Sequence, residues 1–392
     1  ITTAHDQDTG LAKLTATGNG GWAHGAIQVR DNLVCADFDP SEVSFMSFSV
    51  TIVPSGRQFQ MQRDDTVLTA ALQAGIGLPY GCKDGACGSC KCKLQEGRVI
   101  HGAHQSKALS AQEEAAGYVL TCCATPQTDL VIEARQVVGL GENPVVKMPT
   151  RVTSLSRVAP DVMVLRLQLP ATHTFGWRAG QYIEFILKDG LRRSYTVAKA
   201  PHTAKAPGVN GIELHIRHMP GGVFTDHVFG AMKEKDILRA EGPMGTFFVR
   251  DDSERPIVLL ASGTGLAPIK TIVEHLRHKD NQRPVVLYWG CRSRADLYLH
   301  DWAQQQAAEL PWLRYVPVLS EPKPEDAWTG RTGFVHQAVM ADLPDLSAHE
   351  VYACGAPVMV SAARREFVAQ AGLPDEFFYA DAFTSMADKV GG

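Results

Sequence analysis

Small polar and larger apolar residues alternate from Ser47 to Val53, which is typical of a strand with one buried face. A second strand is expected at Gln58–Gln62, beyond the turn residues Pro54-Ser55-Gly56. Apolar residues then recur at helical spacing over Thr66–Ala74, and we expect Asp64 or Asp65 to cap that helix.

The same region continues with short elements. Ser110 and Glu113 have the spacing of a capping box and predict a short helix. Strands are expected at Lys91–Leu94, Tyr118–Cys122 and Leu130–Ala134. Short strands around one or two helices indicate a small β-grasp domain.

Many short strands follow, separated by turn residues, and this pattern favours an antiparallel β-barrel. The expected strands are Arg151–Ser156, Val162–Leu169, Tyr182–Leu187, Ser194–Ala198 and Ile212–His218. A helical pattern from Thr225 to Met232 comes directly after two glycines.

The last part of the chain alternates strands with helices, which predicts a parallel, doubly wound α/β sheet. The expected strands are Ile257–Ala261, Val285–Trp289, Tyr315–Leu319, Val351–Cys354 and Phe377–Ala380. The expected helices are Pro268–Lys279, Ala295–Leu310, Val335–Ala341 and Met359–Ala371.

These patterns divide the chain into an N-terminal segment, three domains and one linker: 1–45, 46–139 (β-grasp), 140–149 (linker, rich in Gly and Pro), 150–252 (barrel) and 253–392 (α/β). The first 45 residues are rich in Gly, Thr, Asp and Asn and lack a sustained period. We interpret them as a disordered or non-native extension, with Met46 as the true start; a small structured addition is the alternative.

Composition excludes several classes of partner. The net charge is −4, which gives no basic surface for nucleic acid and no polybasic membrane signal. No apolar run approaches the ~20 residues of a spanning helix, and no secretory signal is evident. Nine cysteines, four of them in a cluster pattern, favour a reducing cytoplasm over a disulfide scaffold.

The most specific motif is the cysteine spacing. Cys82, Cys87 and Cys90 lie within nine residues, and Cys122 follows 32 residues later, which is the C-x4-C-x2-C…C spacing of a plant-type [2Fe–2S] cluster. Each iron needs two thiolates besides the two bridging sulfides. Gly81, Gly85 and Gly88 are expected to reach positive φ and to bring backbone N–H groups close to the sulfurs.

Alternatives to this interpretation are buried free thiols and a zinc site, although zinc sites more often use paired C-x2-C units. Cys92 lies in a strand-like stretch, so we expect a core thiol there. The fourth ligand is Cys122 or Cys123, and we prefer Cys122 because Leu120-Thr121-Cys122 resembles the Leu-x-Cys pattern of plant-type ferredoxins.

Two further glycine-rich stretches suit phosphate groups. Gly221 and Gly222 precede the helical pattern at Thr225, where free N–H groups would meet a diphosphate. Gly263 and Gly265 come directly after a buried strand and before a helix, a placement that strengthens an otherwise weak Gly-x-Gly signal.

From about residue 47 to 385 the chain resembles electron-transfer reductases that join an N-terminal plant-type ferredoxin domain to a ferredoxin–NADP reductase-like module. Such proteins feed ring-hydroxylating dioxygenases, diiron monooxygenases and the dehydrase that makes 3,6-dideoxy sugars. The overall resemblance is nearest to the CDP-6-deoxy-Δ3,4-glucoseen reductase group. It implies a [2Fe-2S] ferredoxin domain, an FAD-binding barrel and an NAD(P)H-binding domain.

The resemblance also implies roles on the flavin side. In the run Arg193-Ser194-Tyr195-Thr196, the arginine would meet the flavin diphosphate, the tyrosine would pack on the isoalloxazine and ribityl region, and the Thr196 hydroxyl would reach flavin N5. A second diphosphate contact and the FAD nucleotide half are assigned by the same resemblance to Gly221, Gly222, Thr225, His215 and Arg217. For Arg193, Tyr195 and His215, ordinary surface or strand positions remain the alternatives.

On the nucleotide side, Gly263, Thr264, Gly265 and Pro268 resemble the nicotinamide-nucleotide loop. Cys354 and Gly355 resemble the Cys-Gly-x-Pro motif beside the nicotinamide, and Phe383 resembles the C-terminal aromatic residue of the group. With Thr196, Cys354 and Phe383 are the expected catalytic residues. Plain packing is the alternative for both Cys354 and Phe383.

Electron counting then gives the expected activity. Nicotinamide gives two electrons as hydride, a [2Fe–2S] cluster takes one, and a flavin can accept a pair and release single electrons. The expected partner is an electron-accepting oxygenase or sugar dehydrase. A self-contained oxygenase is disfavoured because no haem or diiron segment is evident, and an iron–sulfur sensor because the flavin and nicotinamide motifs are intact.

NADH is expected over NADPH. NADPH-selective relatives place a Ser-Arg pair after the third strand of the nucleotide domain, where this chain has Ser320 and Glu321. A carboxylate there would repel the 2′-phosphate. Arg292 and Arg294 are the counter-argument, so NADPH stays possible.

Overall fold

The computed structural model describes residues 47–139, 143–171, 175–204 and 211–384, together with the backbone of residues 25–29 and 32–36. Residues 1–46 and 47–392 form separate compact units. In the first unit, β1 (Gly25–Val29) pairs antiparallel with β2 (Asn32–Ala36). The interpretation of residues 1–45 as an extension otherwise lies outside the described residues.

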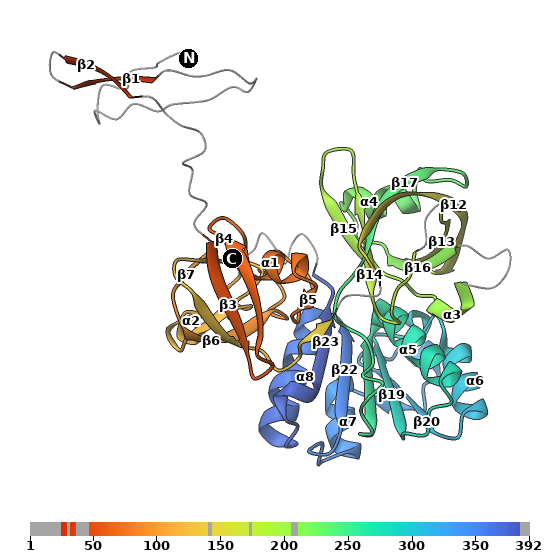
Figure 1. Ribbon diagram of the computed structural model, residues 1–392. Coiled ribbons are helices and arrows are strands. Elements are labelled where there is room, and N and C mark those ends of the chain that lie inside the picture. Colours follow the sequence, from red (N-terminus) through yellow and green to blue (C-terminus); the bar gives the residue numbers. More distant parts are fainter. Residues whose placement is uncertain are drawn as a thin grey trace. The chain divides into compact units, whose positions relative to one another are not determined.

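The second unit begins with the β-grasp domain (Figure 1). Its strands lie in the order β4-β3-β10-β6-β8, with β3 and β10 parallel at the centre. The elements are β3 (Ser47–Val53), β4 (Arg57–Gln62), α1 (Val67–Gln73), β5 (Ile76–Gly77), β6 (Lys91–Glu96), β7 (Val99–His101), α2 (Ala111–Ala115), β8 (Tyr118–Leu120), β9 (Ala124–Pro126), β10 (Leu130–Glu133) and β11 (Val138–Gly139).

Capping decides where the two helices of this domain begin. Ser110 and Glu113 form the expected capping box at α2. At α1 the expectation of Asp64 or Asp65 is wrong, because the Thr66 hydroxyl accepts the bond from the Thr69 amide. Asp65 instead accepts from the amide of Gln62 and closes the preceding turn.

The barrel domain curls its strands in the order β15-β14-β17-β12-β13-β16, and every pairing is antiparallel. Its elements are β12 (Val146–Ala159), β13 (Val162–Gln168), β14 (Tyr182–Ile186), β15 (Arg192–Thr196), α3 (Pro201–Ala204), β16 (Gly211–Arg217), α4 (Val223–Phe229) and β17 (Ile237–Met244). The pattern analysis missed β17, which lies between β14 and β12.

The linker expected at 140–149 is shorter on its C-terminal side. Strand β12 already begins at Val146, and Met148 is buried in the barrel core. Residues 140–142 lie outside the described residues. The hydrophobic Met148 was the signal that the strand had started.

The third domain, here called the sheet domain, is a parallel sheet in the order β21-β20-β19-β18-β22-β23. Its elements are β18 (Ile257–Ser262), η2 (Gly263–Gly265), α5 (Leu266–His278), β19 (Val285–Cys291), η3 (Arg294–Asp296), α6 (His300–Glu309), β20 (Leu313–Leu319), η4 (Pro324–Asp326), β21 (Arg331–Thr332), α7 (Val335–Asp342), β22 (Glu350–Gly355), α8 (Pro357–Gln370), η5 (Asp375–Phe377) and β23 (Phe378–Ala382).

Both faces of this sheet are covered, as the expected doubly wound fold requires. Ile257 and Leu259 of β18 share one core with α5 and α6, whereas Val258 and Leu260 share another with α7 and α8. Because all strands are parallel, their carboxyl ends lie at one edge, where ligands bind in such folds.

Within the described ranges, no helix combines the length and the apolar character needed to cross a membrane.

Arg283→Met is expected to lower the free energy of unfolding by about 3–5 kcal/mol, because it leaves a buried carboxylate without its partner. The Glu350 side chain is fully buried, and its Oε1 lies 2.6 Å from Arg283 Nη1. Urea unfolding monitored by tryptophan fluorescence measures the loss.

Arg277→Met is the matched control, because Arg277 pairs with Glu309 on the surface. That exposed pair is expected to contribute about 1 kcal/mol or less. Equal shifts of the urea midpoint in the two variants would contradict the assignment, whereas Arg283→Met with Glu350→Leu should recover most of the stability.

Candidate functional site

The cysteine loop lies between β5 and β6 and gathers its thiols in two pairs. The Sγ atoms of Cys82 and Cys87 are hydrogen-bonded neighbours, and the Sγ atoms of Cys90 and Cys122 lie 3.2 Å apart. No group of three or more His, Cys, Asp or Glu side chains in the described residues surrounds a single ion position. Paired thiols suit a binuclear cluster, in which each iron takes two from the protein.

Backbone amides already point at these sulfurs. The N–H groups of Ala86 and Cys87 donate to Cys82 Sγ over 3.3 Å, and the amide of Ser89 donates to Cys87 Sγ over 3.5 Å. Such donors stabilise thiolate and cluster charge. The residues of the loop therefore fit the cluster that their spacing implies.

Glycines shape the loop in two ways. Gly85 and Gly88 both have φ +75°, as expected. Gly81 does not have positive φ, so that expectation is wrong. A Cβ on Gly81 would lie 3.3 Å from Cys87 Sγ, and its role is close approach.

The structure separates the two candidates for the fourth ligand. Cys122 is buried and faces Cys90, whereas Cys123 Sγ lies 3.5 Å from Cys122 Sγ and packs under Gly85. Cys92 is in the core of the β-grasp domain, and burial raises its pKa to about 12. The ligand set Cys82, Cys87, Cys90 and Cys122 stays a prediction that this geometry supports.

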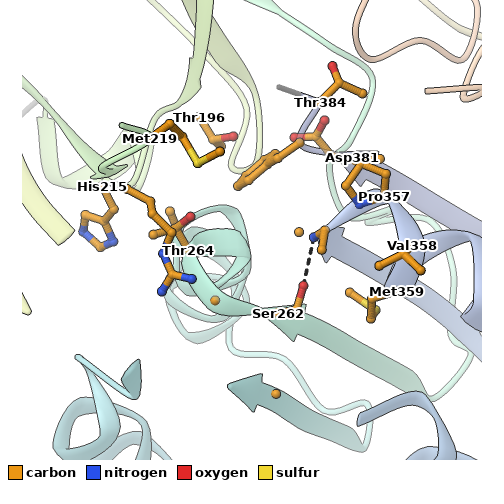
Figure 2. A pocket seen from close by; sticks show the side chains of 18 of the residues that line it. Thr196, His215, Met219, Ser262, Thr264, Pro357, Val358, Met359, Asp381 and Thr384 are labelled. Carbon is orange, nitrogen blue, oxygen red and sulfur yellow. Dashed lines mark hydrogen bonds between the residues drawn. The ribbon is translucent and has the colours of Figure 1, made fainter. Parts of the chain in front are cut away.

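A cavity of about 1280 Å³ opens where the three domains meet, and all three line it. Figure 2 shows Thr196 and Met219 of the barrel domain on one side and Pro357 and Asp381 of the sheet domain on the other. Gly81 and Cys82 of the cysteine loop complete the wall. The cavity is large enough for a dinucleotide and a nicotinamide ring together.

The expected flavin residues form the barrel side of this wall. Strand β15 lines the cavity along its whole length, including the expected residues Arg193, Ser194, Tyr195 and Thr196. The Tyr195 ring packs 5.2 Å from Phe224, and burial raises the pKa of its hydroxyl. An aromatic surface next to a hydroxyl on one strand suits a flat, apolar ring with a polar edge.

The diphosphate candidates also line the cavity. Gly221 has φ +83°, and Gly222 is the N-cap of α4. The expected free N–H groups are not found here, because the Gly221 amide donates to Asp226 Oδ2 over 3.1 Å and the Gly222 amide to Met219 O over 2.8 Å. The Thr225 hydroxyl donates to Met219 O over 2.8 Å and so holds the turn itself. A built-in cation is provided by Arg217, whose Nη2 is buried without a hydrogen-bond partner among the described residues.

His215 serves the fold more directly than a cofactor. Its two ring nitrogens lie 3.0 Å from the Tyr298 hydroxyl and 3.1 Å from Glu213 Oε1. The ring edge is in the cavity lining, but neither nitrogen is left for a ligand. The contact ties the barrel domain to the sheet domain.

The nucleotide turn follows β18 as expected. Ser262, Gly263 and Thr264 line the cavity, and Ser262 Oγ accepts the amide of Ala356 over 2.9 Å, drawn dashed in Figure 2. Gly265 does not line it: a Cβ there would lie 2.2 Å from Cys354 O. Pro268 is buried within α5, so both residues shape the turn from behind.

The expected catalytic residues divide in the same way. Thr196 and Phe383 line the cavity, as does the expected binding residue Gly355, whose carbonyl oxygen accepts from the Phe383 amide over 2.8 Å. Cys354 is fully buried behind this surface, and burial raises the pKa of its thiol well above the usual range. The thiol is therefore protonated and lies beneath the cavity floor. A chemical role for Cys354 stays a prediction.

At the far end of the sheet edge, Ser320 lines the cavity and Glu321 does not. Arg292 and Asp296 line it instead, and the Glu321 amide donates to Arg292 O over 2.9 Å. Arg294 is bonded to Asp326 and turns away from this role. The charges at the expected phosphate position are therefore mixed.

Sequence reasoning missed Asp381, which lies in β23 and lines the cavity. Burial and, to a lesser degree, the nearby Cys87 raise the pKa of Asp381 to about 7, although a hydrogen bond with Thr196 acts the other way. A carboxylate within the apolar run Phe377–Phe383 was the available signal. Ser262 opens the phosphate turn in the sequence pattern but was not among the expected binding residues.

Comparison with known proteins agrees with this division into domains. Residues 50–127 match the 2Fe-2S iron-sulfur cluster binding domain, residues 149–249 the oxidoreductase FAD-binding domain, and residues 259–365 the oxidoreductase NAD-binding domain. The predicted cofactors and order of domains are confirmed.

Similar proteins match this chain over almost their whole length. The CDP-6-deoxy-L-threo-D-glycero-4-hexulose-3-dehydrase reductase of Yersinia pseudotuberculosis is 43% identical over 86% of this chain and 99% of its own. The phenol hydroxylase P5 protein of Acinetobacter pittii is 35% identical over 88% and 97%. The crystal structure of the Amycolatopsis cytochrome P450 reductase GcoB has a TM-score of 0.68 at 32% identity, covering 86% of this chain and 99% of that one.

The chain thus belongs to the family of NAD(P)H-dependent electron-transfer reductases in which a 2Fe-2S cluster binding domain precedes an FAD-binding and an NAD-binding domain.

Proposed function

We propose that this chain draws electrons from NADH by way of FAD and a [2Fe-2S] cluster and delivers them one at a time to a separate dehydrase that acts on a CDP-6-deoxy-hexulose. The observation that carries the proposal is the shared cavity. One space is lined by β15, by the turn after β18 and by Cys82, so groups held by three domains would lie next to one another.

The residues that line the cavity have different roles. Bound FAD supplies the exchange between hydride and single electrons. Arg193 and Arg217 offer cationic groups for diphosphates, Tyr195 offers an aromatic surface, and the Thr196 hydroxyl is held by the carboxyl group of Asp381. Phe383 covers the sheet side, where a nicotinamide ring would displace it or stack against it.

The choice of partner rests on the relatives. The relative that is 43% identical is named as a reductase of a hexulose dehydrase, and the relative that is 35% identical is named with phenol hydroxylase. An aromatic oxygenase is therefore the second candidate. A free-standing redox sensor is the remaining alternative, and it predicts reduction by NADH without steady turnover.

Reconstitution tests the partner directly. The purified chain, NADH and a CDP-6-deoxy-hexulose dehydrase with its substrate should give steady formation of the deoxygenated sugar. The same chain with a phenol hydroxylase oxygenase component is the comparison. Turnover only with the oxygenase would overturn the choice, and no turnover with either would favour the sensor.

We also place the chain in the cytoplasm. The cysteines gathered at the cluster loop need a reducing compartment to remain free thiols until iron arrives. Fractionation of cells that produce the chain would contradict this location if the protein were found outside the cytoplasm.

Cys87→Ser is expected to abolish the EPR signal of the reduced [2Fe-2S] cluster and to bring NADH-driven cytochrome c reduction to background. Cys87 belongs to one of the two thiol pairs, and an alcohol is a poor iron ligand. Reduction of ferricyanide by NADH should persist, because the flavin and nucleotide residues lie on other domains.

Cys92→Ser is the matched control. Cys92 is buried where Cys87 is half-buried, and it lies two residues beyond Cys90 but outside the two pairs. It should keep the EPR signal. A normal signal in Cys87→Ser would refute the ligand assignment.

NADH should have the higher kcat/KM, by roughly a hundredfold if the repulsion of a 2′-phosphate costs a few kcal/mol. Asp296 and Arg292 line the cavity near Ser320 with opposite charges, and Glu321 adds a carboxylate next to Ser320 but outside the lining. Glu321→Arg should narrow the preference. Equal kcat/KM values for the two nucleotides with ferricyanide as acceptor would show that Arg292 dominates.

A further inference from the structure

Lys83 follows the cluster residue Cys82 and has φ +63°, a left-handed conformation that glycine adopts far more readily than lysine. Glycine is used at two other positions of the same loop, Gly85 and Gly88. A lysine held in this conformation is an outlier, and such outliers persist where the surrounding structure compensates for them. The compensation is found in the contacts of its side chain.

The Lys83 ammonium group reaches into the barrel domain. Its Nζ lies 2.8 Å from Glu184 Oε1 and 3.1 Å from Met244 Sδ. Glu184 is on β14 and is only 3% exposed, and its other oxygen is bonded to Arg192. The buried carboxylate thus has one cation from its own domain and a second from the cysteine loop.

The residues just before Cys82 are bonded to the barrel domain as well. The Tyr182 hydroxyl donates to Gly81 O over 3.0 Å, and the amide of Gly245 donates to the Tyr80 hydroxyl over 2.7 Å. Cys82 therefore lies between two anchored neighbours. It is also the cluster residue that lines the cavity next to β15.

We propose that Lys83 is a positioning residue, whose ion pair with Glu184 holds Cys82 and the iron site on it against the flavin side of the cavity for electron transfer. The proposal rests on the proposed function and deepens it, because it names the contact that makes the step between two domains fast. The anchors at Tyr80 and Gly81 are neutral hydrogen bonds, whereas Lys83 and Glu184 form an ion pair.

The loop offers a matched control in Lys91. Lys91 follows the cluster residue Cys90, as Lys83 follows Cys82, and it also pairs with a carboxylate, Glu113, over 2.6 Å. Glu113 belongs to the same domain as Lys91. Replacing either lysine by Met removes the same charge next to a cluster residue, but only Lys83→Met breaks a contact between domains.

The first readout is electron flow in the cofactor-loaded protein. Lys83→Met should lower NADH-driven cytochrome c reduction severalfold, because a loop that is no longer held lengthens the distance that the electron must cross. Ferricyanide reduction and the cluster EPR signal should stay normal. Lys91→Met should keep both activities, and Lys83→Arg should restore most of the cytochrome c rate.

The second readout needs no turnover. Hydrogen–deuterium exchange of the oxidised, cofactor-loaded protein follows the peptide 237–247, which contains the Gly245 amide bonded to Tyr80. Its exchange should be faster in Lys83→Met and unchanged in Lys91→Met. Lys83→Gly, which suits the backbone conformation but lacks the charge, should behave like Lys83→Met.

The outcomes distinguish a failure of the proposed electron-transfer function from a failure of the role of Lys83. If NADH fails to reduce the cluster in the unaltered protein, the proposed function is wrong, and the exchange experiment still decides on the contact. If the unaltered protein transfers electrons but Lys83→Met and Lys91→Met agree in both readouts, the role of Lys83 is wrong. A normal Lys83→Gly variant would mean that backbone conformation alone matters.

Discussion

The site depends on the anchoring of the cysteine loop to the barrel domain. Gly81 and Lys83, the two neighbours of Cys82, each contact β14, through Tyr182 and Glu184 respectively. Because Cys82 and Gly81 supply part of the cavity wall, the cavity exists in this form only while the loop is docked. The geometry for electron transfer therefore depends on how the β-grasp domain packs against the barrel domain.

The barrel and sheet domains are joined by a different kind of contact. Glu213, His215 and Tyr298 form a buried polar chain, with Lys270 close to Glu213. Burial alone would raise the pKa of Glu213, but the bond to His215 and nearby cations lower it to about 2. A carboxyl group whose pKa is lowered by folding stabilises the folded state at any pH above its ordinary pKa. That contribution is lost as the pH falls toward 2. Glu213 should therefore stay ionised across the neutral range, whereas burial lowers the pKa of His215 and favours its neutral form.

Most of the fold and the centre of the site could be predicted from local sequence patterns. The spacing of Cys82, Cys87 and Cys90 and the run Arg193–Thr196 each involve only a few adjacent residues, and the structure brings Cys82 and that run to one cavity. Strand β17 was missed because glycine and proline interrupt its alternation. Lys83 with Glu184, and Asp381 with Thr196, were not predictable, since each pair joins residues far apart in the chain whose proximity arises only when the domains dock.

Main-chain packing explains why some expected binding residues are not at the surface of the cavity. A Cβ on Gly265 would lie 2.2 Å from Cys354 O, and one on Gly355 would lie 2.3 Å from Ser262 Oγ. The ends of β18 and β22 are therefore pressed together, and their backbone forms the cavity floor. This packing places the Cys354 side chain behind the floor. The glycine after Cys354 is needed because the two strands approach each other so closely. Any influence of Cys354 on a nicotinamide would pass through the backbone of Gly355.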